Sequence, residues 1–111
     1  MNRSFRLTRR AEASLTEIAR WTTVNFGLRQ AENYEAELLS RCEGILNGQV
    51  YSRSCAVLVD EAADLRFARA GEHFLMFLDQ PDEVVIVDIL HSRSDVPRHV
   101  AALTTKKNEG L

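Results

Sequence analysis

The stretch Val84-Val85-Ile86-Val87-Asp88-Ile89-Leu90 is the most apolar segment of the chain, and it runs directly into His91-Ser92-Arg93-Ser94-Asp95. It is short for a helix, and its β-branched residues favour extended backbone. Pro81 and Asp82, just before it, are typical of a turn. We therefore predict a strand in the middle of a sheet, which carries a cluster of polar side chains to the rim of that sheet.

Length and composition indicate an ordinary globular protein. The chain has 111 residues, enough for one domain with one hydrophobic core. Its hydrophobic content of 45% and charged content of 27% are typical of soluble domains. No apolar run is long enough to span a membrane, and the charged N-terminus lacks the apolar core of a secretory signal. We expect a single domain over residues 1–111, located in the cytoplasm.

The sequence carries none of the compact motifs that bind a metal ion or a nucleotide, such as CxxC, HExxH or a glycine-rich phosphate loop. Two cysteines, Cys42 and Cys55, are too few for a disulfide framework. We therefore expect no metal and no cofactor. The formal net charge of −2 differs from the basic excess of most DNA- and RNA-binding domains, so we expect no sequence-specific nucleic-acid binding.

The first half of the chain predicts a short strand followed by two helices. Alternation over Arg3–Leu7 indicates the strand. Apolar residues then recur at helical spacing over Arg9–Phe26, with Thr8 as the N-cap, and again over Leu28–Leu46. Because only Gly27 separates the two helices, they must form an antiparallel hairpin.

The second half predicts strands. The stretch Gln49–Asp64 has no clear period and is predicted as a loop, in which Cys55–Val59 could form a short strand. A short helix over Asp95–Leu103 closes the chain, and the residues from Lys106 onward are expected to fray. Between these segments we predict an antiparallel meander of three strands joined by short turns: Leu65–Ala70, His73–Leu78 and Val84–Leu90.

The predicted fold class is α+β, with an N-terminal strand, an antiparallel helical hairpin packed on one face of a small antiparallel sheet, and a short C-terminal helix. In the last strand we assign Val85, Val87 and Ile89 to the helix side and the alternate residues to the other side. In the middle strand the second face carries one of two apolar sets: Phe74, Met76 and Leu78, or Leu75 and Phe77. An apolar face left uncovered predicts a protein partner laid across it.

The order of these elements and several short sequence motifs resemble the ParE/RelE superfamily of bacterial toxins over nearly the whole chain. Each motif is weak alone, but the ordered set at these spacings is specific, and the exit of the last strand resembles the ParE branch most. The motifs are Phe5-Arg6-Leu7-Thr8, Ala11-Glu12-Ala13, Leu15-x-x-Ile18, Gly27, Gln30-Ala31, Tyr34, Leu38, Leu65-Arg66, Gly71, His73, Phe77 and Ile89-Leu90-His91-x-Arg93-x-Asp95.

The resemblance implies the toxin component of a type II toxin–antitoxin pair, a system that stabilises plasmids or chromosomal segments. ParE-like members poison DNA gyrase by binding it, whereas RelE-like members cut messenger RNA on the ribosome. Both are neutralised by an antitoxin, ParD-like for the ParE branch, which wraps its C-terminal segment over the toxin in a heteromeric complex. An antitoxin segment of this kind folds on binding and suits the uncovered apolar face predicted above.

Charge distinguishes the two branches. Metal-free RNA cleavage needs a base, an acid and cations for the phosphate, and the candidates here are Arg66, His73, His91 and Arg93. Lysine is absent from the predicted sheet, and Glu72 and Asp88 stand where RelE-like members are basic. We therefore predict a gyrase-binding toxin with no catalytic residues. The alternative is a ribosome-dependent endoribonuclease, and a third hypothesis is an inactive relative that only binds its partner.

Two sets of binding residues follow from this interpretation. The predicted antitoxin contacts are Trp21, Arg66, Arg69, Phe74, Met76, Leu78, Ile86 and Asp88. The predicted target contacts are His91, Arg93 and Arg98. Structural alternatives stay open: Trp21 as a core residue, His73 and His91 as parts of strand ends, and Arg93 with Asp95 as a local ion pair or helix cap.

Overall fold

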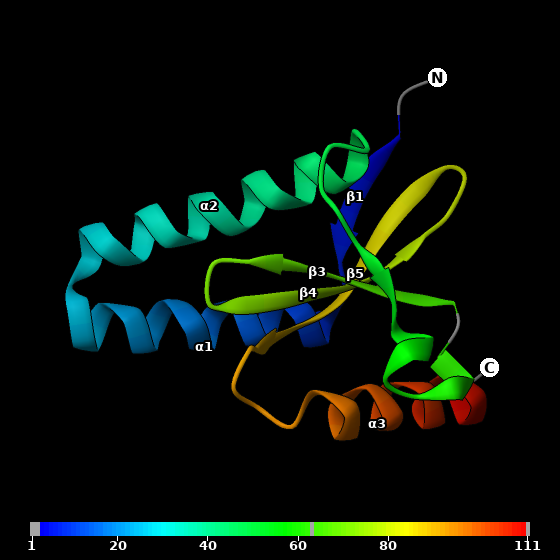
Figure 1. Ribbon diagram of the computed structural model, residues 1–111. Coiled ribbons are helices and arrows are strands. Elements are labelled where there is room, and N and C mark those ends of the chain that lie inside the picture. The colour runs from blue at the N-terminus through cyan, green and yellow to red at the C-terminus, as the bar shows by residue number, and fades with distance from the viewer. Residues whose placement is uncertain (1–2, 63, 111) are drawn as a thin grey trace.

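The computed structural model describes residues 3–62 and 64–110, without the side chains of residues 61 and 104–110. A helical hairpin, a sheet and a C-terminal helix make up the structure (Figure 1). The elements are β1 (Ser4–Leu7), α1 (Arg9–Phe26), α2 (Leu28–Leu46), β2 (Arg53–Ser54), two 3₁₀ turns η1 (Cys55–Val57) and η2 (Asp60–Ala62), β3 (Leu65–Ala70), β4 (His73–Asp79), β5 (Glu83–His91) and α3 (Val96–Gly110).

The five strands form one sheet in the order β1-β5-β4-β3-β2. The predicted meander of β3, β4 and β5 is confirmed, and both of its connections are antiparallel. The N-terminal strand, whose pairing was not predicted, joins the sheet through β5 in parallel, so the sheet is mostly antiparallel. Thr8 extends this pairing past the end of β1: its amide donates to the Ile86 carbonyl at 3.0 Å, and its hydroxyl donates to the Val87 carbonyl at 2.8 Å.

The helical hairpin has the predicted bounds. Thr8 caps α1, because its Oγ1 accepts the Ala11 amide at 3.1 Å. Gly27 joins the two helices at φ 95°, a left-handed value that favours glycine. The apolar faces of both helices pack on one face of the sheet, in a core that includes Ala11, Leu38, Cys42, Ala68, Leu75, Phe77, Val84, Ile86 and Ile89.

A β-bulge in β5 changes which side chains face the helices. Met76 of β4 pairs with Asp88, but the next residue, Phe77, pairs with Ile86, so Val87 has no partner on β4. The prediction placed Ile89 on the helix side correctly, but it was wrong for Val84, Ile86 and Val87. The extra residue shifts the two-residue alternation by one position, and strict alternation cannot hold on both sides of it.

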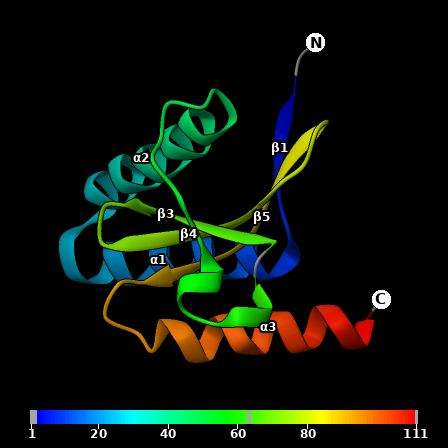
Figure 2. The same ribbon diagram turned by 45° about the vertical axis from the view of Figure 1, so that its right-hand side comes forward.

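The second face of the sheet is covered by the chain itself, which contradicts the predicted bare face. The helix α3 and the two 3₁₀ turns pack against it, and Figure 2 shows α3 beneath the turns and apart from the α1–α2 hairpin. This second core includes Cys55, Ala62, Leu65, Met76, Leu90, Val96, Val100 and Leu103. Of the two sets considered for β4, Phe74, Met76 and Leu78 therefore face α3. Cys42 and Cys55 are free and lie in different cores.

Two local predictions also need correction. Cys55–Val57 is a 3₁₀ turn and not a strand, because Ser54 Oγ accepts the Ala56 amide at 3.1 Å and starts the turn. The C-terminal helix extends to Gly110, so the predicted fraying from Lys106 is wrong as far as that residue. No proline follows Pro97, and the residues up to Gly110 include good helix formers.

The predicted start of this helix is confirmed, because Asp95 Oδ1 accepts the Arg98 amide at 3.3 Å.

Replacing a buried residue of α3 tests how much this helix contributes to stability. Val100 is 0% exposed in the second core, so Val100→Asp buries a carboxylate among apolar side chains. We expect the free energy of unfolding to fall by about 3 kcal/mol or more. The matched control is His99→Asp on the exposed side of the same helix, with an expected change of about 0.5 kcal/mol at most. Urea denaturation measures both, and equal midpoints for the two variants would contradict the packing of α3 on the sheet.

Candidate functional site

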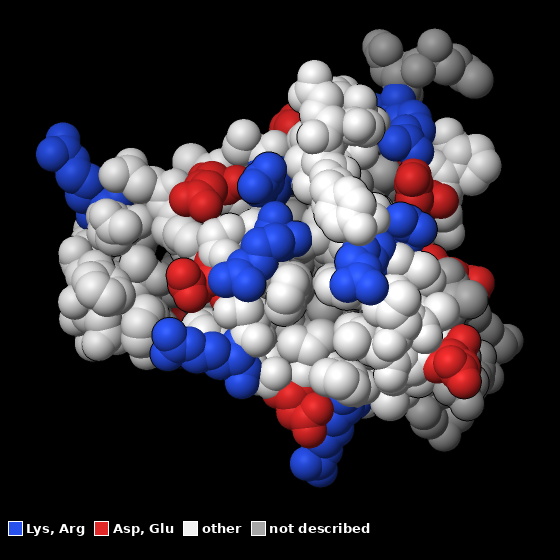
Figure 3. Space-filling view, viewed as in Figure 1, with Lys and Arg blue, Asp and Glu red and all other residues white. Residues whose placement is uncertain are grey.

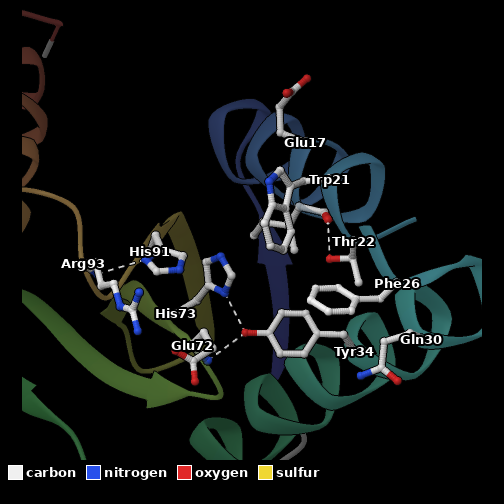
Figure 4. Close-up of a pocket in the computed structure, with 11 residues that line it drawn as sticks. Glu17, Trp21, Thr22, Phe26, Gln30, Tyr34, Glu72, His73, His91 and Arg93 are labelled. Atoms are coloured by element: carbon white, nitrogen blue, oxygen red, sulfur yellow. Dashed lines mark hydrogen bonds between the residues drawn. The ribbon is translucent and has the colours of Figure 1, made fainter. Parts of the chain in front are cut away.

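A groove of about 630 Å³ lies between the helical hairpin and the end of the sheet where β4 begins and β5 finishes. Figure 4 shows aromatic side chains from the hairpin on one side and polar side chains from the strands on the other. A smaller hollow of about 380 Å³ shares four of the lining residues and continues the groove toward the start of α1. The groove is lined by Glu17, Ile18, Trp21, Thr22, Phe26, Gln30, Tyr34, Glu72, His73, His91 and Arg93.

Tyr34 of α2 holds the β3–β4 turn against the hairpin. Its hydroxyl accepts the Glu72 amide at 2.9 Å and lies 2.6 Å from His73 Nδ1 (Figure 4). Gly71 leaves room for this contact, because a Cβ at Gly71 would lie 2.7 Å from a ring carbon of Tyr34. The φ of 59° at Gly71 also favours glycine. The turn and the helix therefore fit together only with glycine at this position.

His73 is neutral near pH 7. Burial lowers its pKa to about 4, and the nearby His91 ring adds to the effect, with 5.1 Å between the ring centroids. Of the neighbouring charges, Glu72 opposes the shift and Arg69 supports it. Burial raises the pKa of Tyr34, so its hydroxyl keeps its proton and can donate to Nδ1 of the neutral ring. The groove thus has an uncharged hydrogen-bonded pair at its strand side.

His91 is exposed and belongs to the turn that leaves β5. Its Nδ1 accepts the Arg93 amide at 3.0 Å, and its carbonyl accepts the Ser94 hydroxyl at 2.6 Å. His91 therefore does take part in the structure of the strand end, as one of the open hypotheses held. Its Nε2 makes neither of these bonds and can still contact a ligand. Asp95 acts as the cap of α3, and no ion pair joins it to Arg93 within residues 3–62 and 64–110.

The hairpin side of the groove is aromatic and open to solvent. Trp21 and Phe26 are 60% and 66% exposed, and their rings meet edge to face with centroids 5.7 Å apart. Trp21 is therefore not a core residue. Phe26, Tyr34 and Glu72 were missed as site residues. Position 26 continues the spacing of the apolar stripe of α1, but that end of the hairpin extends past the sheet, a fact that periodicity alone does not reveal.

The structure brings together some of the predicted site residues and separates others. Trp21, His73, His91 and Arg93 all line the groove. Arg66 does not, because its Nε and Nη2 donate to the hydroxyl and the carbonyl of Ser52 at 2.9 and 3.1 Å. Arg69 donates to the Gly71 carbonyl at 2.6 Å and lies over the Phe74 ring. The four residues proposed for RNA cleavage are therefore not one cluster.

Three of the predicted antitoxin contacts are in the interior. Met76 and Ile86 are 0% exposed, one in each core, so a partner cannot reach them in this conformation. Asp88 is 5% exposed and faces α1: its Oδ1 accepts the Ser14 hydroxyl at 2.6 Å and the Ile89 amide at 2.8 Å. Its carboxylate therefore accepts a backbone amide beside the bulge, and its side chain does not lie on a surface that a partner could reach. Phe74 and Leu78 are partly exposed, and their contact with an antitoxin stays a prediction.

Charged side chains of both signs are mixed over the face shown in Figure 3, with no continuous basic surface on it. Within the described part of the chain, no group of three or more His, Cys, Asp or Glu side chains could hold a metal ion. No helix of the described residues is long and apolar enough to cross a membrane.

The family model described as the ParE toxin of the type II toxin–antitoxin system parDE matches residues 5–96. The chain belongs to the ParE toxin family. The match ends at Val96, so most of α3 lies beyond it. A solved structure described as the chromosomal ParDE TA system from P. aeruginosa is similar to this ParE-family chain with a TM-score of 0.66 and 19% identity, over 82% of this chain and 96% of the other. This likeness shows a common fold. No curated protein sequence matches the chain.

The low pKa of His73 predicts how stability depends on pH. A pKa of about 4 in the folded state against 6.5 for the free group means that folding disfavours protonation of the ring. This contribution to stability is complete above about pH 6.5 and is lost as the pH falls toward 4. We expect His73→Gln, which cannot be protonated, to reduce the loss of stability between pH 7 and pH 4.5. Urea midpoints across this range measure it.

The exposed His99 gives the matched control for this titration, because His99→Gln removes an imidazole that lies outside the groove. Both variants keep every carboxylate of the protein, which also titrates in this pH range. A difference between their stability profiles therefore comes from the histidine that was replaced. A stability profile of His73→Gln that runs parallel to that of the unsubstituted protein would show that His73 titrates normally.

Proposed function

We propose that this protein binds DNA gyrase and blocks its activity, and that a cognate antitoxin neutralises it. The observation that carries this proposal is the family match over residues 5–96, together with the α+β fold of a ParDE structure. The groove adds physical support, because exposed aromatic rings and a neutral imidazole suit protein contact and give no mechanism for cleaving a substrate. The toxin then acts by binding and needs no metal and no cofactor.

The proposed target contacts are His91, Arg93 and Arg98. His91 is the last residue of β5 and Arg93 lies in the turn that follows, and both line the groove, whereas Arg98 is exposed on the first turn of α3. These residues lie within eight positions of one another and connect the end of the sheet to the helix. They supply two guanidinium groups and one imidazole, which suit carboxylates or backbone carbonyls of a protein partner.

A supercoiling assay tests this function. Purified protein added to DNA gyrase and relaxed plasmid is expected to stop supercoiling in a dose-dependent way, and an equimolar cognate antitoxin is expected to restore it. The double substitution His91→Ala with Arg93→Ala should raise the inhibitory concentration by about tenfold or more, since it removes two contacts of the target. The matched control is Arg20→Ala, an exposed arginine of α1 outside the groove, with an expected change of about twofold at most.

One observation favours the ribonuclease alternative: His73, His91 and Arg93 share the groove with Tyr34. Against it, the Nδ1 atoms of both imidazoles are engaged, and Arg66 lies elsewhere. Primer extension on ribosome-bound message decides between the two functions. Cleavage that is lost in His91→Ala, with gyrase unaffected, would replace the proposed function by the alternative. No effect on gyrase, on message or on growth would support the inactive relative.

A further inference from the structure

The turn after β5, which begins at His91 and carries Arg93, is joined to the β3–β4 turn beside it. The Ser92 amide donates to the Glu72 carbonyl at 2.9 Å, and His73 pairs with His91 across β4 and β5. The rings of these two histidines also meet edge to face, with centroids 5.1 Å apart. Because backbone and ring contacts both connect the two turns, the place of one turn depends on the place of the other.

Tyr34 holds the β3–β4 turn from the opposite side. It belongs to α2, and its hydroxyl accepts the Glu72 amide at 2.9 Å and lies 2.6 Å from His73 Nδ1 (Figure 4). Each of these two residues also contacts the turn after β5. One hydroxyl of the hairpin therefore starts two connections, one that reaches the Ser92 amide and one that reaches the His91 ring.

Both connections end at the groove residues of the turn after β5. His91 Nδ1 accepts the Arg93 amide at 3.0 Å, so the orientation of the imidazole and the position of the Arg93 backbone depend on each other. When Nδ1 of a neutral imidazole accepts a hydrogen bond, the proton is on Nε2, and that N–H is the group that the ring offers to a partner. The His91 carbonyl also accepts the amide and the hydroxyl of Ser94, at 3.0 and 2.6 Å, which closes the turn.

The packing around Tyr34 leaves little room for displacement. A Cβ at Gly71 would lie 2.7 Å from a ring carbon of Tyr34 and 2.8 Å from its hydroxyl oxygen. The half-buried ring of Tyr34 also contacts the His73 ring, with 5.5 Å between the centroids. Groups held in this way by packing and hydrogen bonds are preorganised, so less freedom is lost when a partner binds.

The hydroxyl of Tyr34, and not its ring, makes the connection. The ring fills the space between α2 and the β3–β4 turn, which a phenylalanine ring would also fill. The oxygen alone contacts the Glu72 amide and the His73 imidazole. Removing this one atom therefore separates a role in packing from a role in positioning.

We propose that Tyr34 is a positioning residue for target binding, whose hydroxyl sets the orientation of His91 and of the backbone at Arg93 through the β3–β4 turn. This inference rests on the proposed function, in which these two residues contact DNA gyrase. The hydroxyl acts before the target arrives, because it holds the imidazole and the start of the arginine side chain in the arrangement that binds. Inhibition of gyrase therefore depends on an oxygen atom of the helical hairpin.

Hydrogen exchange tests the positioning without gyrase. In Tyr34→Phe we expect the Ser92 and Arg93 amides to exchange about fivefold faster or more, because the turn that holds them is released. The nitrogen chemical shifts of the His91 ring should move toward a mixture of tautomers, since the bond to Nδ1 no longer selects one. The matched reference is the Val59 amide, hydrogen-bonded to the Cys55 carbonyl outside the groove, with an unchanged rate. Equal changes at all three amides, or none, would overturn the proposal.

The supercoiling assay measures the consequence for the target. We expect Tyr34→Phe to raise the inhibitory concentration by about fivefold, which is the effect of losing one such hydrogen bond. In a protein that already carries His91→Ala with Arg93→Ala, the same change should add about twofold at most, because its effect passes through those residues. The matched control is Tyr51→Phe, which removes the hydroxyl of an 81% exposed tyrosine outside the groove, with an expected change of about twofold at most.

The two measurements fail in different ways. An unchanged inhibitory concentration in Tyr34→Phe, or an effect as large in the doubly substituted protein as in the unsubstituted one, would overturn the positioning role even if the protein inhibits gyrase. An unsubstituted protein that leaves gyrase active would overturn the proposed function, and hydrogen exchange would still decide whether Tyr34 holds the turn. Thermal unfolding of each variant checks that the fold is kept.

Discussion

Burial of β5 on both faces is the constraint on which the rest of the structure depends. The helical hairpin covers one face of this strand and α3 covers the other, so nearly all its residues are withdrawn from water. The bulge at Val87 allows this arrangement, because it lets the two ends of the strand present different sets of side chains to the same layer. Asp88 satisfies the backbone next to the bulge and connects it to Ser14 of α1.

The end of β5 also determines the character of the groove. There the sheet stops, the hairpin continues, and Tyr34 joins the two through the Glu72 amide and the His73 ring. The same burial that keeps His73 neutral removes it as a proton donor at neutral pH. His73 and His91 therefore line the groove together with the exposed rings of Trp21 and Phe26.

The position of α3 determines which apolar side chains of the fold stay exposed. A sheet of this size with one open apolar face would need another polypeptide to cover it, and here the last segment of the chain does so. Most of that segment lies beyond the part of the chain matched by the ParE family model. The helix that covers the second face of the sheet is therefore mostly outside the matched range, although its side chains complete the second core.

The amino-acid sequence by itself determined the elements and their family, because helical and strand periodicities and glycine turns are local properties: both helices of the hairpin have the predicted bounds, and the ordered motifs agree with the family match. It also placed His73, His91, Arg93 and Trp21 among the candidates that meet at the groove. Only the tertiary structure decided which face of the sheet is covered and which residues of β5 face the helices. These depend on a one-residue bulge and on the docking of α3, which are contacts between segments far apart in the chain and leave no period in the sequence.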